Sequence, residues 1–248
     1  MLHARDKPPK PYFRAMRLVQ VSGRSLALTW EEAVLLAWAQ GEVVETEYGQ
    51  RAKEIMAVIE VREPFSEPRY HLKGIVGSVE DYVAEVVGGA HDHLVEKYGY
   101  TYHHRLTRFH GVDQLKVVAE KLRRAPYTRR GICVTWQPAA DLASEHPPCL
   151  VYLWFHSPDG KRLVLHAHMR SNDALKAAHM NMLAFTMLQR KVAGEAGLEV
   201  GEYVHIADSF HIYESDWKHA AAMYAAGEEE RRRWRLTTEQ YRRLFKRG

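Results

Sequence analysis

The sequence predicts an α+β fold, because helical and strand-like patterns mix along the chain without the strict alternation of a doubly wound sheet. Two apolar stretches, 150–155 and 162–169, flank the turn Ser157-Pro158-Asp159-Gly160 and predict a β-hairpin. The longest helical pattern covers 173–196 and ends at Gly197, a residue type that closes many helices in the left-handed conformation.

The N-terminal part contains two further predicted helices and one strand. Thr29 is a suitable N-cap for a helix at about 30–40. Residues 57–61 are typical of a strand. Ser78 opens the second helix, whose valines and tyrosine share one face until Gly88-Gly89 end it.

The remaining elements follow the same signals. Apolar residues recur at helical spacing over 112–124, and Pro126 stops that helix. Residues 132–136 and 203–213 are predicted strands. The charged stretch after 213 is predicted to be helical.

Composition indicates a globular protein, and 248 residues are enough for one large domain or two small ones. We expect a single domain, 1–248, in which the proline-bearing residues 1–12 form a loose arm. No apolar run reaches the roughly 18 residues of a membrane-spanning helix, and the N-terminus lacks a secretory h-region, so we expect a cytoplasmic protein. Two cysteines, Cys133 and Cys149, cannot form a disulfide scaffold.

The net charge of +4 makes a nucleic-acid partner unlikely, since a small anionic substrate explains local arginines equally well. The histidines at 91–104 lack metal-ligand spacing with Cys or Asp, so no metal is expected.

Several short segments are unremarkable singly and specific together. A cysteine after two prolines is usually a buried inert thiol, and a double arginine is usually a solvated turn. In chain order, however, the segments are Asp113-Gln114-Leu115, Thr128-Arg129-Arg130, Trp136-Gln137-Pro138, Pro147-Pro148-Cys149, Arg170-Ser171-Asn172-Asp173, Asn181 and His211-Ile212-Tyr213. From about Tyr102 to Trp217 this order resembles the thymidylate synthase family, most closely its shorter archaeal-type members. The resemblance implies a mixed β-sheet packed by helices, with sheet faces forming a dimer interface.

The resemblance makes Cys149 the nucleophile of an enzyme that converts dUMP to dTMP. C5 of uracil attacks a one-carbon donor only after a thiolate has added to C6, and this covalent activation splits one hard step into easier ones. The donor and reductant would be 5,10-methylenetetrahydrofolate or a related modified pterin. A thiolate needs a cationic neighbour that lowers its pKa, and the resemblance places Arg170 there.

Phosphate recognition calls for several arginines, because guanidinium groups bind phosphate with paired hydrogen bonds. The resemblance implies that Arg129 and Arg130 reach the active site of the other subunit of a homodimer, while Arg170 and Ser171 act within their own subunit. Arg51 is the candidate for an additional phosphate contact from an early loop.

Base and sugar recognition fall to the other residues. The Asn181 amide matches O4 and N3–H of uracil, whereas cytosine reverses that pattern, so the residue favours dUMP over dCMP. The resemblance assigns Asp173 to the base or its bound water, and His211 and Tyr213 to the sugar 3′-hydroxyl.

Proton transfers need further groups. Tyr102 resembles the family tyrosine that assists proton removal from C5. A general acid is also required, for which we expect Glu85, with Glu80 as the rival on the same predicted helix.

The chain ends in the charged stretch 241–248, where the family has a short apolar tail that closes over the folate and excludes water. This departure leaves two alternatives to methylation. One is a folate-dependent (d)UMP or (d)CMP hydroxymethylase without the reductive step. The other is a silent family member that binds nucleotide or RNA, against which the intact Cys149 argues.

Overall fold

The computed structural model describes residues 16–245, so the predicted arm at 1–12 lies outside the described part of the chain. Seven strands form one mixed sheet in the order β1-β3-β8-β7-β6-β5, with β2 paired to β3. The β1–β3 and β7–β8 pairs are parallel and the other pairs are antiparallel. The strands are β1 (Leu18–Gly23), β2 (Glu42–Glu45), β3 (Arg51–Val61), β5 (Ile132–Val134), β6 (Leu150–His156), β7 (Arg162–Asp173) and β8 (Glu199–Tyr213). The predicted α+β class and the predicted 157–160 hairpin are confirmed.

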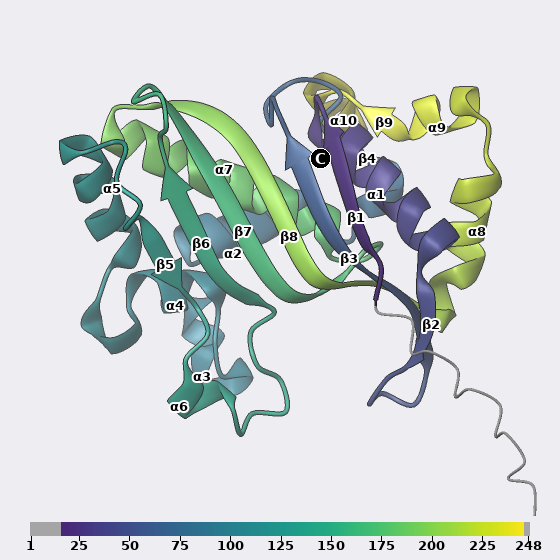
Figure 1. The fold of residues 1–248 in the computed structure, drawn as a ribbon, viewed down its shortest axis with the longest axis horizontal. Coiled ribbons are helices and arrows are strands. Elements are labelled where there is room, and N and C mark those ends of the chain that lie inside the picture. Colours follow the sequence, from purple (N-terminus) through teal and green to yellow (C-terminus); the bar gives the residue numbers. More distant parts are fainter. Residues whose placement is uncertain (1–15, 246–248) are drawn as a thin grey trace, which may run out of the picture.

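Helices cover one face of this sheet, and Figure 1 shows them behind the strands. The long helix α7 packs on β7 and β8, while α1 packs on β1 and β3. The helices are α1 (Leu26–Gln40), α2 (Val79–Gly88), α3 (Val95–Tyr98), α4 (Tyr102–Thr107), α5 (Gln114–Arg124), α6 (Pro138–Asp141), α7 (Ala178–Ala196), α8 (Trp217–Ala225), α9 (Glu228–Trp234) and α10 (Thr238–Phe245). Short 3-10 turns lie at Leu72–Gly74, Asp92–Leu94, Phe109–Gly111 and Glu214–Asp216. Among the described residues, no helix is long and apolar enough to span a membrane.

The C-terminal helices α8 to α10 lie beside α1, next to a small second sheet of β4 (Tyr70–His71) and β9 (Arg235–Leu236) (Figure 1). The strand β9 corrects the expectation of a purely helical end. Burial explains why this segment docks: Glu31 on α1 is 3% exposed and pairs with Arg235 at 2.6 Å and Arg231 at 3.1 Å. A buried carboxylate with two guanidinium partners is stable only while the C-terminal segment stays in place.

Helix starts differ from the sequence prediction at three places, of which α5, beginning at Gln114 and not at 112, differs by two residues. Helix α1 begins at Leu26 with Ser25 at its N-cap, while Thr29 lies inside the first turn and donates back to the Ser25 carbonyl at 2.8 Å. Residues 173–177 are not helical: Asp173 ends β7, and α7 begins at Ala178. The β-sheet pairing of β7 continues to this residue and overrides the helical pattern of the sequence.

Strand lengths also depend on partners. β3 begins at Arg51 rather than at 57, because β2 pairs with its residues 51–54 and β8 pairs with it from residue 52 onward. β8 begins at Glu199 rather than at 203, because β7 continues alongside it. β5 stops at Val134, two residues short of the prediction. β7 and β8 are thereby long enough to bring Asp173 opposite His211.

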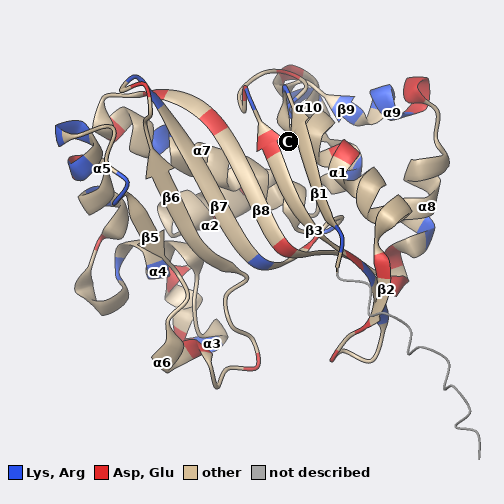
Figure 2. Ribbon diagram, viewed as in Figure 1, with Lys and Arg blue, Asp and Glu red and all other residues tan. Residues whose placement is uncertain are grey.

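The opposite face of the sheet is not covered by any described helix (Figure 1). Strand β6 carries no Lys, Arg, Asp or Glu, and it is uniformly tan in Figure 2. Its outward side chains Tyr152 and Trp154 contact His168 and His166 of β7 in ring pairs with centroids 5.0 and 4.9 Å apart. This face therefore presents aromatic and imidazole groups, with few full charges at its centre.

Candidate active site

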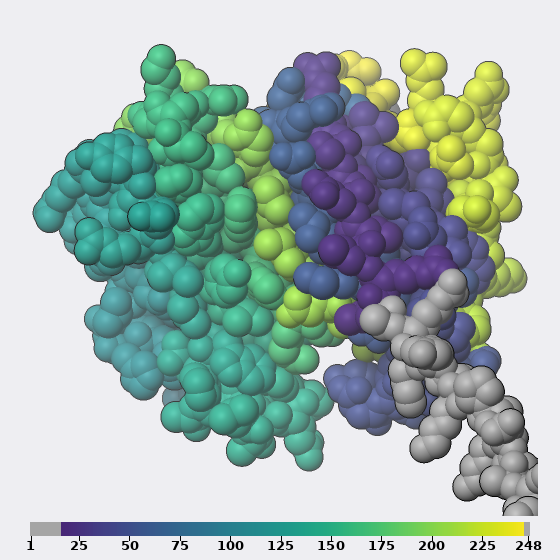
Figure 3. Space-filling model, viewed as in Figure 1, coloured from purple at the N-terminus to yellow at the C-terminus, as the bar shows by residue number. Residues whose placement is uncertain are grey.

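A cavity of about 360 Å³ opens at the end of the sheet where β7 and β8 stop. Its walls come from the loop after β2, from the segment that leads into β6, and from the start of α7. Figure 3 shows the surface hollowed between the blue 46–50 loop and the green segment before β6. Eight residues predicted for the site line this one cavity: Tyr102, Cys149, Arg170, Ser171, Asp173, Asn181, His211 and Tyr213.

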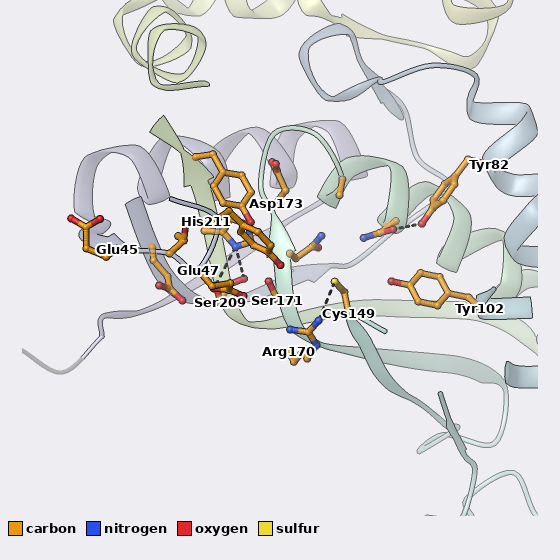
Figure 4. Close-up of a pocket in the computed structure, with 17 residues that line it drawn as sticks. Glu45, Glu47, Tyr82, Tyr102, Cys149, Arg170, Ser171, Asp173, Ser209 and His211 are labelled. Atoms are coloured by element: carbon orange, nitrogen blue, oxygen red, sulfur yellow. Dashed lines mark hydrogen bonds between the residues drawn. The ribbon is translucent and has the colours of Figure 1, made fainter. Parts of the chain in front are cut away.

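Cys149 lies immediately before β6 and points into the cavity (Figure 4). The guanidinium of Arg170 lies 4.0 Å from its sulfur, and the same side chain donates to the carbonyls of Pro147 and Pro148 at 2.9 and 3.0 Å. The two prolines leave these carbonyls on a stiff backbone, which holds the arginine against the thiol. The neighbour expected for the nucleophile is therefore in place.

The electrostatic effect of this pair differs from the sequence expectation. Burial raises the pKa of the Cys149 thiol, and the Arg170 charge offsets that rise only in part. The expectation of a lowered pKa is corrected, because removing a thiolate from water costs more than one half-exposed guanidinium returns. The chain alone thus holds a protonated thiol beside a cation, and attack requires that its proton be taken up elsewhere.

Asp173 and His211 face each other across the ends of β7 and β8. The Asp173 carboxylate accepts from the backbone N–H groups of Leu175 and Lys176 at 3.0 and 2.8 Å and thereby closes the turn before α7. Burial raises the pKa of Asp173, and burial also lowers the pKa of His211. His211 Nδ1 lies 3.1 Å from the Ser209 hydroxyl, so its ring is held in a fixed orientation at the cavity wall.

Asn181 lies in the first turn of α7 and is 4% exposed. Its Oδ1 accepts a hydrogen bond of 2.5 Å from the hydroxyl of Tyr82 on α2. Tyr82 also lines the cavity, although the sequence pattern indicated only an apolar helix face for it. The one available signal was its hydroxyl on an otherwise valine-rich face.

Tyr102 is the first residue of α4, and its hydroxyl accepts from the backbone N–H of Leu150 at 3.4 Å. Leu150 directly follows the cysteine, so the phenol lies close to the thiol (Figure 4). Burial raises the pKa of Tyr102 well above its ordinary value, which keeps the hydroxyl protonated. A protonated phenol at this place can orient a water molecule. It can take up a proton only if it passes its own proton on to another group.

The two candidate glutamates of α2 point to different places. Glu85 pairs with His91 Nδ1 at 2.8 Å and lines two cavities of about 540 and 310 Å³ that adjoin the first one at Tyr82. Glu80 instead accepts from the Tyr241 hydroxyl of α10 at 2.7 Å. Glu85 is therefore the one that faces the site, although it does not line the cavity that contains Cys149.

Three predicted phosphate contacts lie outside this cavity. Arg51 pairs with Glu214 at 2.5 Å and lies over the Trp217 ring at 5.2 Å, so its guanidinium is already engaged. Arg129 and Arg130 are exposed in the loop before β5, where the Arg129 carbonyl accepts from Trp154 Nε1 at 3.1 Å. Trp154 belongs to the uncovered face of the sheet. Within one chain these two arginines are thus at the sheet face and not at the pocket.

The charge balance of the pocket is informative. Among its described lining residues, Arg170 is the single lysine or arginine. Four carboxylates line the same cavity, from Glu45, Glu47, Glu54 and Asp173. The loop glutamates were not anticipated from the sequence. A phosphate would therefore find too little positive charge in one chain. In residues 16–245, no group of three or more metal-ligating side chains is present.

The helix-backed mixed sheet carries a partly buried thiol at a polar cavity that also holds an arginine, an amide and a histidine, which is the kind of concave site found in enzymes. Residues 44–246 match the family model described as thymidylate synthase. The chain therefore belongs to the thymidylate synthase family, a family of methyltransferases of nucleotide biosynthesis.

Archaeal relatives agree with this assignment. A protein of Methanopyrus kandleri is 38% identical over 200 residues, which cover 81% of this chain and 95% of the relative. Relatives from Methanothermobacter thermautotrophicus and Methanocaldococcus jannaschii are each 32% identical, over 204 and 201 residues. These matches cover 77% and 76% of this chain and 91% and 88% of the relatives. All three carry the name "Putative thymidylate synthase".

Proposed function

We propose that this protein methylates dUMP to dTMP through a covalent adduct between Cys149 and C6 of the base. The observation that carries the proposal is the joint presence of the Cys149 thiol and the Asn181 amide in one cavity. The thiol supplies the nucleophile, and the amide supplies the donor and acceptor that match O4 and N3–H of uracil. His211 and Tyr213, at the end of β8, line the same cavity, which supports a role for them in binding the sugar hydroxyl.

Because the pKa of Cys149 is raised, the surrounding residues must also stabilise the charge that develops when the thiol reacts. As the sulfur bonds to C6, the thiol proton must leave and negative charge develops on O4 of the base. The Asn181 amide donates to that oxygen, and Arg170 compensates the charge of the sulfur before bond formation. The Asn181 contact strengthens as charge develops on O4, which is the condition for accelerating the step, whereas Arg170 favours the preceding loss of the thiol proton.

The cofactor proposed is 5,10-methylenetetrahydrofolate or a modified pterin, which when bound would supply the one-carbon unit and the hydride. The adjoining cavity of about 540 Å³ fits such a flat ligand, because four tyrosines line it together with Lys97 and Glu85. Tyrosine rings stack on aromatic ligands, and the ammonium group suits an anionic tail. Glu85 could hold or give a proton there, and its contact with His91 orients the carboxyl group.

Product analysis tests the proposal. Purified protein is incubated with 5-tritiated dUMP and methylenetetrahydrofolate, and both tritium release and dTMP are measured. We expect both signals in the unmodified protein and neither in Cys149→Ser. Cys133→Ala, which removes the other thiol, itself buried on strand β5, serves as the matched control and should stay active. Full turnover by Cys149→Ser would refute the covalent mechanism.

A second candidate is the hydroxymethylase, and one observation favours it. Within the part of the chain that the structure describes, no residue of 217–245 lines the cavity that contains Cys149 or the two cavities beside it. Tyr241 of α10 stacks on Tyr70 at 4.1 Å instead, away from Cys149. A site that no described C-terminal residue covers admits water to the one-carbon intermediate. Tritium release with 5-hydroxymethyl-dUMP as product, and no dTMP, would identify this reaction.

We further propose a homodimer through the uncovered sheet face, with Arg129 and Arg130 donated to the neighbouring pocket. The excess of carboxylates in the cavity and the position of both arginines beside that face support this arrangement. In a symmetric dimer the same patch meets itself, so each donated contact occurs twice.

Subunit complementation tests the donation. Cys149→Ala chains and Arg129→Ala/Arg130→Ala chains, each inactive alone, are unfolded together and refolded. Donated arginines give mixed dimers one intact site, so about a quarter of full activity should return. Arginines that act within their own chain restore nothing. The exposed pair Arg123 and Arg124 at the end of α5, changed to alanine, is the matched control and should keep activity.

A further inference from the structure

Tyr82 lies where the cavity of about 360 Å³ that contains Cys149 meets the two cavities beside it, and it lines all three. It reaches this place from α2, which packs on α7, the helix that carries Asn181. Figure 4 shows its hydroxyl directed at a neighbouring side chain and joined to it by a hydrogen bond. That partner is Asn181 Oδ1, at 2.5 Å.

The direction of this hydrogen bond has a consequence for the amide. Burial raises the pKa of Tyr82 far above its ordinary value, so the phenol remains a donor at every working pH. Among the described contacts of its hydroxyl, Asn181 Oδ1 is the acceptor that takes the proton. An amide turned by 180° would present its NH2 group to the phenol and leave the phenolic proton without that acceptor. The unmet donor would then be costly, because the contact is part-buried between the packed helices α2 and α7.

We propose that Tyr82 is a positioning residue that fixes the Asn181 amide in the orientation that reads uracil. This inference rests on the proposed function. With one Oδ1 lone pair held by the phenol, the Nδ2 hydrogens and the second lone pair remain for the ligand. Nδ2 then donates to O4 of uracil, and Oδ1 accepts from N3–H. Cytosine presents an amino group and a bare N3, so its recognition requires the turned amide that Tyr82 opposes.

The ratio of two dissociation constants tests this role. The full chain and its Tyr82→Phe variant are titrated calorimetrically with dUMP and with dCMP. We expect the preference for dUMP over dCMP to fall about tenfold in the variant, equal to 1.4 kcal/mol, because turning the amide no longer leaves a buried donor unmet. Tyr241→Phe is the matched control: it removes another phenol that hydrogen-bonds to α2, at Glu80, and should leave the ratio unchanged.

Two further variants separate this inference from the proposed function. Asn181→Ala should abolish most of the preference, and the Tyr82→Phe/Asn181→Ala double variant should match it, since Tyr82 acts only through the amide. A Tyr82→Phe ratio equal to that of the unmodified protein, or equal weakening of both nucleotides, would overturn the positioning role while leaving uracil recognition intact. An unmodified protein without preference for dUMP, or an unchanged ratio in Asn181→Ala, would overturn the proposed base recognition itself.

Discussion

Replacing Arg170 by methionine tests the electrostatic account of the nucleophile. The guanidinium lies 4.0 Å from the Cys149 sulfur, a separation at which two unit charges interact by about 4 kcal/mol at an effective dielectric constant near 20. Both side chains are half-buried, so solvent screens a large share of this energy. The thiol pKa, already raised by burial, should rise further in Arg170→Met, because the lowering effect of the guanidinium is lost.

Alkylation by iodoacetamide at pH 8 measures the effect. Fewer thiolates are present in the variant, but each is more nucleophilic, with a Brønsted slope of about 0.4–0.5. The net expectation is that Cys149 reacts roughly three- to tenfold more slowly. Peptide mass spectrometry reports Cys149 separately from Cys133, which is fully buried, with a pKa that burial raises to about 12. Cys133 should stay unlabelled and thereby shows that the fold is intact.

Arg170→Lys is the matched control, because it keeps the charge and loses the two hydrogen bonds to the prolyl carbonyls. Its Cys149 should react at a rate between those of the unmodified protein and Arg170→Met. Equal rates in the unmodified protein and Arg170→Met would refute the reasoning. So would a thiolate absorbance change in the unmodified protein with its midpoint below pH 8, because burial would then not dominate.

Three other perturbations have definite expectations. Glu31→Gln should lower the free energy of unfolding by about 2–4 kcal/mol in urea at pH 7. Burial alone would raise the pKa of this carboxyl group, but hydrogen bonds from His71 and Arg235, together with their charges, lower it to about 2. The stabilisation is therefore present above about pH 5, and the gap between the two proteins should close as pH falls toward 2, whereas a gap independent of pH would argue against the buried charge. Tyr102→Phe should reduce tritium release from dUMP by about 100-fold or more with an unchanged dUMP dissociation constant, and a normal release rate would exclude the phenol from proton transfer. Gly89→Ala should lower the melting temperature, because φ is +72° and a Cβ there would lie 2.3 Å from the His103 ring, while the same change at Gly88, with nothing within 4 Å, is the control that should not.

The sequence predicted the framework of this molecule where short-range chemistry decides. Ser78 caps α2 through the backbone N–H of Asp81, as expected of serine before a helix, and Gly89 ends it in the left-handed conformation. The hairpin at 157–160 formed from its turn residues. Two helix boundaries were predicted wrongly. Asp173 belongs to the sheet and its carboxylate closes a turn over 174–177, so α7 begins only at Ala178. Ser25 instead of Thr29 occupies the N-cap position of α1, without a capping hydrogen bond from its side chain.

By itself, the sequence determined which residue types the proposed site contains and in which order, because Cys149, Arg170 and Asn181 were found from short motifs whose chemistry depends on residue type. Only the tertiary structure decided their electrostatics and orientation. The Cys149 pKa rises since burial depends on every wall of the cavity, and no local motif encodes it. Tyr82 meets Asn181 across 99 positions of the chain, because packing of α2 on α7 sets that contact. Residue types are written locally, whereas dielectric surroundings and hydrogen-bond partners are properties of the folded chain.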